Sequence, residues 1–313
     1  MNNPAPAPIA VSLITGFLGS GKTTYLKHVR TQYQGHKRVY LINDFGKLGV
    51  DTQLLAATDP NVVSIPGGSI FCQCLVTEFV ATLRRVLAEW HTTTAPVEGV
   101  VIEASGIANP KVIADMLRET RLDRFFRLTS IVALADPASF TKLLQTLPNI
   151  RAQIEAADLV LINKADLHAE ERLQETEAAV RTIKPEARLL RTTFSRVSLD
   201  LFAEQDDHTT LHGDYAPCRD PHYISASVML EAPLRIELLE NATRSAGGFL
   251  YRAKGFVPLT DRVIYFDYSQ SGIRTEPVTA PPAERGLVFI AQGDAQSDLN
   301  QLVARLQGGE FNA

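Results

Sequence analysis

The first part of the chain alternates short apolar runs with longer stretches of helical periodicity. Apolar runs of about four to eight residues are typical of buried strands, and parallel strands need crossover helices between them. We therefore expect strands at 9–14, 38–42, 62–65, 97–102, 131–134, 159–162 and 187–191, with helices at 24–34, 76–90, 139–147, 150–157 and 170–184. This alternation predicts an α/β fold with a mostly parallel sheet and helices on both of its faces.

The pattern changes after residue 195. A polar, irregular stretch with prolines runs from 196 to 222 and is typical of a linker. Beyond it we expect strands at 223–230, 249–256, 263–268 and 287–291, with helices at 234–246 and 295–306. The sequence therefore predicts three parts: an α/β domain at 9–195, a linker at 196–222 and a smaller α+β C-terminal domain at 223–308.

The stretch GFLGSGKTT, from Gly16 to Thr24, lies between the first expected strand and the first expected helix. Gly16, Gly21, Lys22 and Thr23 fill every fixed position of the phosphate-binding loop, or P-loop, G-x-x-x-x-G-K-[ST]. Its backbone N–H groups bind phosphate at a helix N-terminus, the lysine reaches the β- and γ-phosphates, and the Thr23 hydroxyl ligates Mg2+. We therefore predict a P-loop NTPase whose phosphate site consists of Gly16, Gly19, Ser20, Gly21, Lys22, Thr23 and Thr24.

Carboxylates follow two other expected strands, at the sheet edge where open α/β sheets bind ligands. Glu103 directly follows the strand at 97–102 and opens the motif E-A-S-G. We expect Glu103 to hold Mg2+ through water or to polarise the attacking water, while the Gly106 N–H bonds the γ-phosphate beside Ser105. Asp44 follows the strand at 38–42 and is either a further catalytic and metal-binding carboxylate or part of a turn-forming Asn-Asp pair.

The motif N-K-A-D, with Asn163, Lys164 and Asp166, follows the apolar strand at 159–162. A carboxylate can accept hydrogen bonds from the N1–H and the exocyclic amine of guanine, whereas adenine offers no matching pair of donors. The Asn and the stem of the Lys can pack on the base and hold the loop. The motif predicts binding of GTP and GDP rather than ATP, in a GTPase with Lys22, Glu103 and Asp44 as catalytic residues.

Composition excludes several classes of function. The chain has 313 residues, of which 45% are apolar and 21% charged, and its net charge is -4. This charge argues against nonspecific binding to nucleic acid or anionic membranes. No apolar run approaches the roughly 20 residues of a membrane span, and the start MNNPAPAPIA has no signal-peptide pattern. We therefore expect a cytoplasmic protein without a nucleic-acid or membrane partner.

The three cysteines, Cys72, Cys74 and Cys218, are too few for a disulfide framework in a chain of this size. Cys72 and Cys74 follow a Pro-Gly-Gly turn that places them at the same sheet edge as the P-loop. Two thiolates, Asp44 and a water can form a tetrahedral zinc or cobalt site. The alternative is a pair of small buried residues. We favour the metal site, because this is the only close cysteine pair and it lies beside the predicted nucleotide.

Taken together, GFLGSGKTT, INDFGKLGVD, the glycine turn with its cysteines, EASGIANP and NKAD resemble the CobW-like family of metallochaperone GTPases. The resemblance covers nearly the whole chain, including YRAKGFV in the expected C-terminal domain. It implies GTP hydrolysis coupled to delivery or insertion of zinc, cobalt or nickel into a client protein or a cofactor such as cobalamin. The partner it implies is a client metalloprotein or an enzyme of cobalamin biosynthesis, and we leave a homodimer open.

Two departures from the family pattern affect the metal site. The family usually carries G-C-x-C-C after its glycine turn, whereas here the segment is G-S-I-F-C-Q-C-L. One alignment keeps Cys72 and Cys74 and loses the third thiolate, and another leaves Ser69 in the first position. The usual N-E-F-G is N-D-F-G, with the shorter side chain of Asp44. The main alternative function is a GTPase switch that acts as an enzyme assembly or activation factor without a metal cargo of its own.

Overall fold

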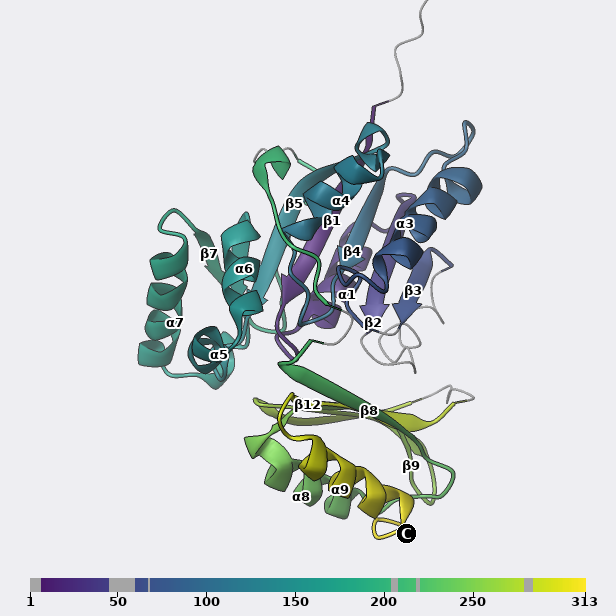
Figure 1. Cartoon of the computed structure of the whole chain (residues 1–313), viewed down its shortest axis with the longest axis vertical. Helices are drawn as coiled ribbons and strands as arrows, with labels where there is room; N and C mark the ends of the chain where they lie inside the picture. Colours follow the sequence, from purple (N-terminus) through teal and green to yellow (C-terminus); the bar gives the residue numbers. More distant parts are fainter. Residues whose placement is uncertain (1–6, 45–59, 67, 204–207, 218–219, 279–283) are drawn as a thin grey trace, which may run out of the picture.

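The computed structural model describes residues 7–44, 60–66, 68–203, 208–217, 220–278 and 284–313. In these parts of the chain, the strands form a seven-stranded parallel sheet and a five-stranded antiparallel sheet. Figure 1 shows the arrows of β2 and β3 pointing towards the antiparallel sheet, which lies beyond their ends. The carboxyl edge of the parallel sheet therefore faces the second sheet. None of the helices described here is both long and apolar enough to cross a bilayer.

The parallel sheet has the strand order β3-β2-β4-β1-β5-β6-β7, and every neighbouring pair is parallel. Its strands are β1 (Ile9–Gly16), β2 (Arg38–Asp44), β3 (Val62–Pro66), β4 (Gly99–Glu103), β5 (Phe126–Ala135), β6 (Leu159–Ile162) and β7 (Arg188–Arg191). The helices of this part are α1 (Lys22–Gln32), α3 (Val76–Arg85), α4 (Val112–Glu119), α5 (Phe140–Thr146), α6 (Pro148–Ala156) and α7 (Glu170–Ile183). The predicted α/β class and parallel sheet are confirmed.

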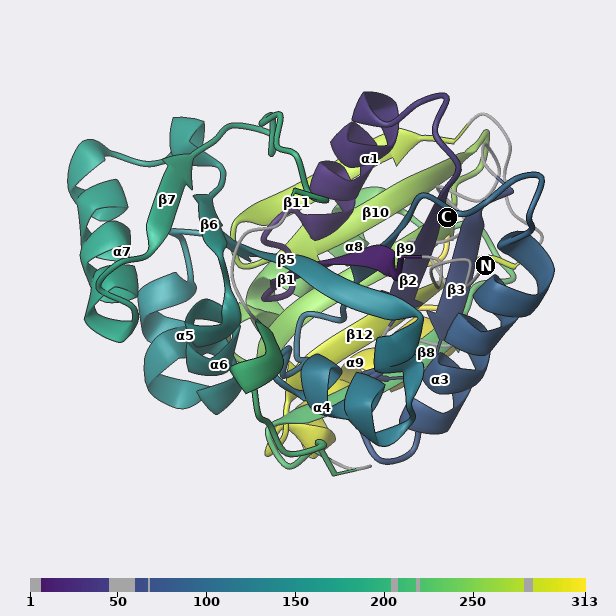
Figure 2. The same cartoon turned by 90° about the horizontal axis from the view of Figure 1, so that it is seen from above.

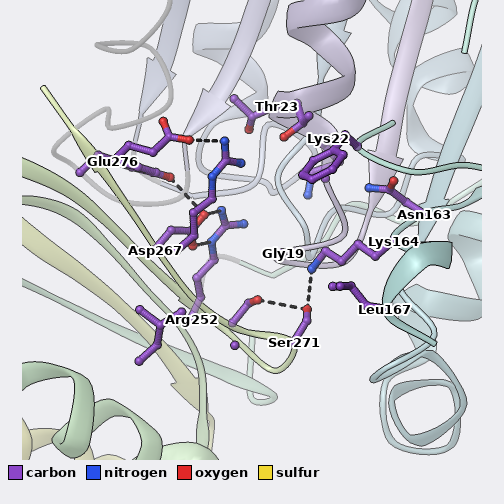
Figure 3. Close-up of a pocket in the computed structure, with 18 of the residues that line it drawn as sticks. Gly19, Lys22, Thr23, Asn163, Lys164, Leu167, Arg252, Asp267, Ser271 and Glu276 are labelled. Atoms are coloured by element: carbon purple, nitrogen blue, oxygen red, sulfur yellow. Dashed lines mark hydrogen bonds and ion pairs between the residues drawn. The ribbon is translucent and has the colours of Figure 1, made fainter. Parts of the chain in front are cut away.

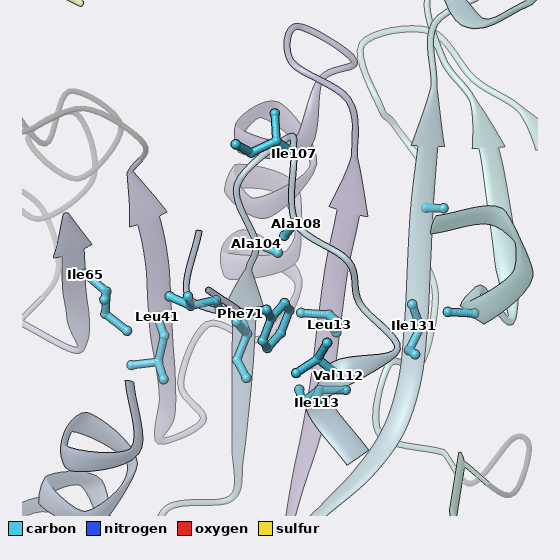
Figure 4. Packing of buried hydrophobic residues seen from close by; sticks show 14 of the residues in the cluster. Leu13, Leu41, Ile65, Phe71, Ala104, Ile107, Ala108, Val112, Ile113 and Ile131 are labelled. Carbon is cyan, nitrogen blue, oxygen red and sulfur yellow. The ribbon is translucent and has the colours of Figure 1, made fainter. Parts of the chain in front are cut away.

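Successive residues of the central strands pack on opposite faces of this sheet. In β2, Val39 and Leu41 belong to a core that includes side chains of α3 and α4, whereas Tyr40 and Ile42 belong to a core that includes side chains of α1. Figure 4 shows part of the first core, with Val112 of α4 packed among strand residues. Because side chains alternate across a strand, both faces need helices, as the sequence predicts.

The antiparallel sheet has the order β11-β10-β9-β12-β8. Its elements are β8 (Tyr223–Met229), α8 (Ile236–Ser245), β9 (Leu250–Pro258), β10 (Val263–Ser269), β11 (Gly272–Pro277), β12 (Gly286–Gln292) and α9 (Gln296–Gln307). Ala253, Phe266 and Phe289 pack against α8 and α9 on one face. On the other face, Tyr265 and Val288 join the core of the parallel sheet, and Figure 2 shows the antiparallel strands beneath that sheet. The predicted α+β C-terminal domain is confirmed, while its boundaries and those of the linker remain predictions.

Three elements differ from the sequence expectation. The helix α4 is absent from the expected elements, although its buried residues Val112, Ile113, Met116 and Leu117 have helical spacing. Strand β5 begins at residue 126 rather than 131, because β1 pairs with it from Ile9 onward. Strand β11 is not among the expected strands, because its sequence G-I-R-T-E-P has almost no apolar residues. The segment is defined as a strand by its antiparallel pairing with β10. A pattern search cannot detect a polar edge strand that only tertiary pairing defines.

A close backbone approach in the antiparallel sheet gives a prediction about stability. A Cβ on Gly255 of β9 would collide with the carbonyl oxygen of Gly286, and backbone cannot move aside as a flexible side chain can. We expect Gly255→Ala to lower the free energy of unfolding by about 1–3 kcal/mol, measured by urea denaturation. Gly248→Ala is the control, because no described atom lies within 4 Å of a Cβ at that position. Equal stability of the two variants would contradict this packing.

Candidate functional site

The P-loop lies between β1 and α1, at the carboxyl edge of the parallel sheet. Its glycines Gly16, Gly19 and Gly21 have φ angles of 131°, 80° and 108°, a region that residues with a side chain rarely adopt. The helix α1 begins at Lys22 rather than at residue 24, with Gly21 as its N-cap. Lys22, Thr23 and Thr24 therefore belong to the first helical turn, whose N–H groups are available to an anion.

Two buried polar side chains meet the start of this helix. The Lys22 ammonium donates to the carbonyl oxygens of Gly16 and Phe17 at 2.9 and 3.1 Å. The Thr23 hydroxyl donates to Oε1 of Glu103, at the end of β4, over 2.8 Å. Glu103 is only 3% exposed. The structure thus brings Glu103 of β4 into contact with the P-loop threonine, two residues that the sequence singles out in separate segments.

The donor set at this point fits a phosphate and Mg2+. Mg2+ prefers oxygen ligands, and the Thr23 hydroxyl and Glu103 carboxylate supply them side by side. The hydroxyls of Ser20 and Ser105 are buried and have no hydrogen-bond partner among the described residues. Buried hydroxyls are normally paired, so both suit an oxygen-rich ligand. Gly106 lies against the P-loop, because a Cβ there would collide with the Leu18 N–H.

The N-K-A-D segment lies after β6 and contacts the P-loop directly. The Asn163 side chain donates to the carbonyl oxygen of Ser20 and accepts from the Ser195 N–H, both over 2.8 Å. Lys164 has a left-handed backbone with φ of 60°. Asn163 therefore holds three loops together at the sheet edge, in line with the loop-holding role that the sequence predicts for it.

A cavity of about 310 Å³ lies between these loops and the antiparallel sheet. Figure 3 shows Lys22, Thr23 and Asn163 on one side of it and Arg252, Asp267 and Glu276 on the other. Of the predicted nucleotide-binding residues, those that line the cavity are Gly19, Gly21, Lys22, Thr23, Thr24, Asn163, Lys164 and Asp166. The phosphate and base motifs thus share one cavity.

The sequence analysis does not identify two exposed apolar side chains at this cavity. Leu167 and Phe194 both line it, and they are 61% and 57% exposed. Exposed apolar side chains beside Asp166 suit the flat faces of a base. The available signal was position, since Phe194 follows β7 at the same sheet edge as the other motifs.

The side chain of Asn43, at the end of β2, connects two loops that the sequence treats separately. Its Oδ1 accepts from the N–H groups of Ile70 and Ser105 at 2.9 and 3.2 Å. Its Nδ2 donates to the carbonyl oxygens of Ile65 and Gly68 at 3.0 and 2.7 Å. This 5% exposed amide uses both acceptor positions and both donors. Asn43 therefore holds two segments at once: the E-A-S-G loop and the segment that precedes the cysteines.

The cysteine pair lies just beyond that contact. Cys72 is buried and Cys74 exposed, and their sulfur atoms are 2.7 Å apart. The Gln73 N–H donates to the Ala216 carbonyl oxygen at 3.0 Å, so the predicted linker packs against this loop. Within the described ranges, no His, Cys, Asp or Glu completes a group of three with the pair. The Asp44 side chain and Cys218 lie outside the described residues, so the metal site at Asp44, Cys72 and Cys74 stays a prediction.

Asp136, at the carboxyl end of β5, joins the base motif to the antiparallel sheet. It accepts from the Lys164 ammonium at 2.7 Å and from the Ser271 hydroxyl. Burial by itself would raise the pKa of Asp136, but the Lys164 charge and the hydrogen bonds from Ser271 and the Ala138 N–H outweigh it. The net effect lowers the pKa of this carboxyl below its usual value.

Comparison with known proteins adds a family match. The family model described as CobW/HypB/UreG, nucleotide-binding domain, matches residues 10–191. The zinc chaperone YjiA of Escherichia coli is 31% identical over 180 residues, which are 57% of this chain and 56% of that protein. The zinc-regulated GTPase metalloprotein activator 1 of Dictyostelium discoideum is 26% identical over 302 residues, covering 79% and 62%. This chain thus spans less than two thirds of either relative. A structure of Zn(II)-bound YjiA GTPase from E. coli is 20% identical, with a TM-score of 0.46, and covers 96% of this chain and 99% of that chain.

The lowered pKa of Asp136 predicts a pH-dependent contribution to stability. A carboxyl whose pKa falls on folding stabilises the fold above its unfolded-state pKa of about 3.9, and this contribution is lost as the pH falls through the folded value. We expect Asp136→Asn to lower the free energy of unfolding by about 1–3 kcal/mol near neutral pH, relative to the parent protein. In urea titrations the gap should close below about pH 4. Asp261→Asn, at an exposed ion pair, is the control. A gap independent of pH would contradict the charge argument.

Proposed function

The chain belongs to the CobW/HypB/UreG family of nucleotide-binding domains, and on this premise we propose that it hydrolyses GTP and couples the reaction to transfer of a transition-metal ion. The observation that carries the proposal is the Asn43 side chain, which bonds the Ser105 N–H beside the P-loop and the Ile70 N–H beside the cysteines. A γ-phosphate that draws the Ser105 loop towards it strains one side of this amide. The strain reaches the thiolates through the other side.

The residues at the P-loop divide the work of phosphoryl transfer. Lys22 exchanges its two carbonyl partners for the β- and γ-phosphate oxygens when nucleotide enters. Thr23 and Glu103 would hold Mg2+, and this ion would supply charge neutralisation at the transferred phosphate. Glu103 also orients or polarises the attacking water. Because Glu103 is buried beside Thr23, it meets the ion and the water where bulk solvent is excluded.

The part of the cavity wall around Asp166 recognises the guanine base. The Asp166 carboxylate accepts the N1–H and the exocyclic amine of guanine, while Leu167 and Phe194 cover the apolar faces of the base. The exposure of these two side chains supports the assignment, since an entering base would bury them.

We propose zinc as the metal cargo, bound by the thiolates of Cys72 and Cys74. Two relatives named as zinc chaperone and zinc-regulated metalloprotein activator support zinc over cobalt or nickel. Their names also support a client metalloprotein as the partner. A role in cobalamin biosynthesis stays an expectation from the family resemblance. A cytoplasmic location and a homodimer remain predictions of the sequence.

The alternative is a GTPase switch that activates an enzyme without carrying metal. It is favoured by one observation, namely that no third ligand joins the cysteine pair among the residues described. Both functions share the nucleotide site, so only metal binding separates them.

Guanine specificity is tested at Asp166. Losing hydrogen bonds to a charged partner should weaken GTP binding by roughly 10- to 100-fold in Asp166→Ala and leave the weak binding of ATP nearly unchanged. Calorimetric titration of both nucleotides measures this, with Asp261→Ala as a surface control. Equal affinity of the unmutated protein for GTP and ATP would remove the basis of the guanine assignment.

Metal coupling is tested by zinc titration of the protein loaded with a GTP analogue or with GDP. We expect one Zn2+ per chain, with affinities that differ between the two states by about 5- to 150-fold. Because thiolate is the binding form, the affinity should fall as the pH is lowered. Cys72→Ser with Cys74→Ser should abolish binding, and Cys218→Ser serves as the single-thiol control. Identical zinc affinity in both nucleotide states would favour the switch without cargo.

A further inference from the structure

The motif Y-R-A-K-G-F-V of the C-terminal domain has no role in the proposed function so far. It forms the middle of β9, where Arg252 and Lys254 are 9% and 5% exposed. Ala253 between them packs on α8 and α9, so the two cations lie on the opposite face of the sheet. Arg252 lines the cavity that contains the P-loop. Burying cations costs free energy unless partners compensate, so the groups that pair with the cation at the cavity show what this face can bind.

Charged side chains from three neighbouring strands continue this face. Arg252 donates to both carboxylate oxygens of Asp267 in β10, over 3.1 and 2.9 Å, and the Tyr265 hydroxyl donates to the same group. Arg274 in β11 forms an ion pair with Glu276. All five side chains line the cavity, and Figure 3 shows Arg252 and Asp267 facing the P-loop. Arg252 and Arg274 thus each pair with a carboxylate, and another anion can take the place of that carboxylate.

Contacts on two sides fix this face against the nucleotide loops. Phe17 of the P-loop packs edge-on against Tyr251, with ring centroids 5.4 Å apart. At the β10–β11 turn, the Ser271 hydroxyl accepts from Lys164, the lysine of the base motif. These contacts hold the arginines across the cavity from Lys22, at a position set by the nucleotide loops themselves.

We propose that this face of the antiparallel sheet is a wall of the nucleotide site, and that Arg252 and Arg274 bind the phosphate groups of the nucleotide. A guanidinium binds phosphate oxygens through two parallel hydrogen bonds, as it binds a carboxylate. Entering phosphates take the places of Asp267 and Glu276, and departing phosphates return the arginines to these acids. The C-terminal domain thereby senses how many phosphates are bound. The inference rests on the proposed binding of GTP and is independent of the metal.

The test compares GTP, GDP and guanosine binding to Arg274→Ala, Arg252→Lys and the parent protein. Arg274 has a side chain that is 55% exposed, so its removal leaves the fold intact. Arg252→Lys keeps the charge but not the paired hydrogen bonds. Arg262→Ala is the control, because this arginine of the same sheet is exposed and pairs with Asp261 outside the cavity. Thermal unfolding of each variant checks its folding.

We expect Arg274→Ala to lower GTP affinity about tenfold, GDP affinity less, and guanosine affinity not at all. The loss should shrink at high salt, because screening weakens the lost charge interaction. The control should bind all three ligands like the parent. GTP affinity unchanged in both variants, or an equal loss for GTP and guanosine, would overturn the inference while leaving GTP binding intact. A parent protein that binds no GTP would instead overturn the proposed function as well.

Discussion

Parallel pairing of the strands around β1 is the constraint on which the chemistry of this protein depends. Parallel strands all end at one edge, so loops far apart in the sequence meet there without any further device. Gly16, Glu103, Asp136 and Asn163 each stand at or just after the end of a strand. The hydrogen bonds from Thr23 to Glu103 and from Asn163 to the P-loop follow from this register.

The antiparallel sheet packs against the carboxyl edge of the parallel sheet rather than against one of its faces. Its two sides differ accordingly. One is apolar and packs on α8 and α9, and the other mixes apolar residues near Tyr265 with the charged residues around Arg252. Charges on a half-buried sheet are tolerable only when they pair, and here the pairs run between neighbouring strands. The apolar residues on this side pack against the core of the parallel sheet, while the charged residues line the cavity.

The sequence revealed those features that short-range spacing encodes. The P-loop, the N-K-A-D segment and the central strands each follow from local patterns, and the structure brings their residues to one cavity. Asn43 was not identified, because its role depends on Ile65, Gly68, Ile70 and Ser105 meeting in space. Strand β11 escapes prediction for a related reason: Arg274 and Glu276 line the cavity, few apolar residues lie between them, and only the pairing with β10 defines the strand.

Asn43 contacts the cysteine loop and the segment before it in a way that does not involve the cysteine side chains. Among the residues that the structure describes, the partners of this amide are all backbone groups. These bonds do not depend on the side chains at positions 72 and 74, so the same link can serve a different set of ligands there. The side chains of Ser69 and Phe71, by contrast, help to shape the loop, because the Ser69 hydroxyl accepts from the Phe71 N–H and Phe71 is fully buried. Under the proposed function, metal preference can then change by substitution at positions 72 and 74 without altering the contacts through which Asn43 links this loop to the E-A-S-G loop. The unusual cysteine spacing of this chain is compatible with such a division.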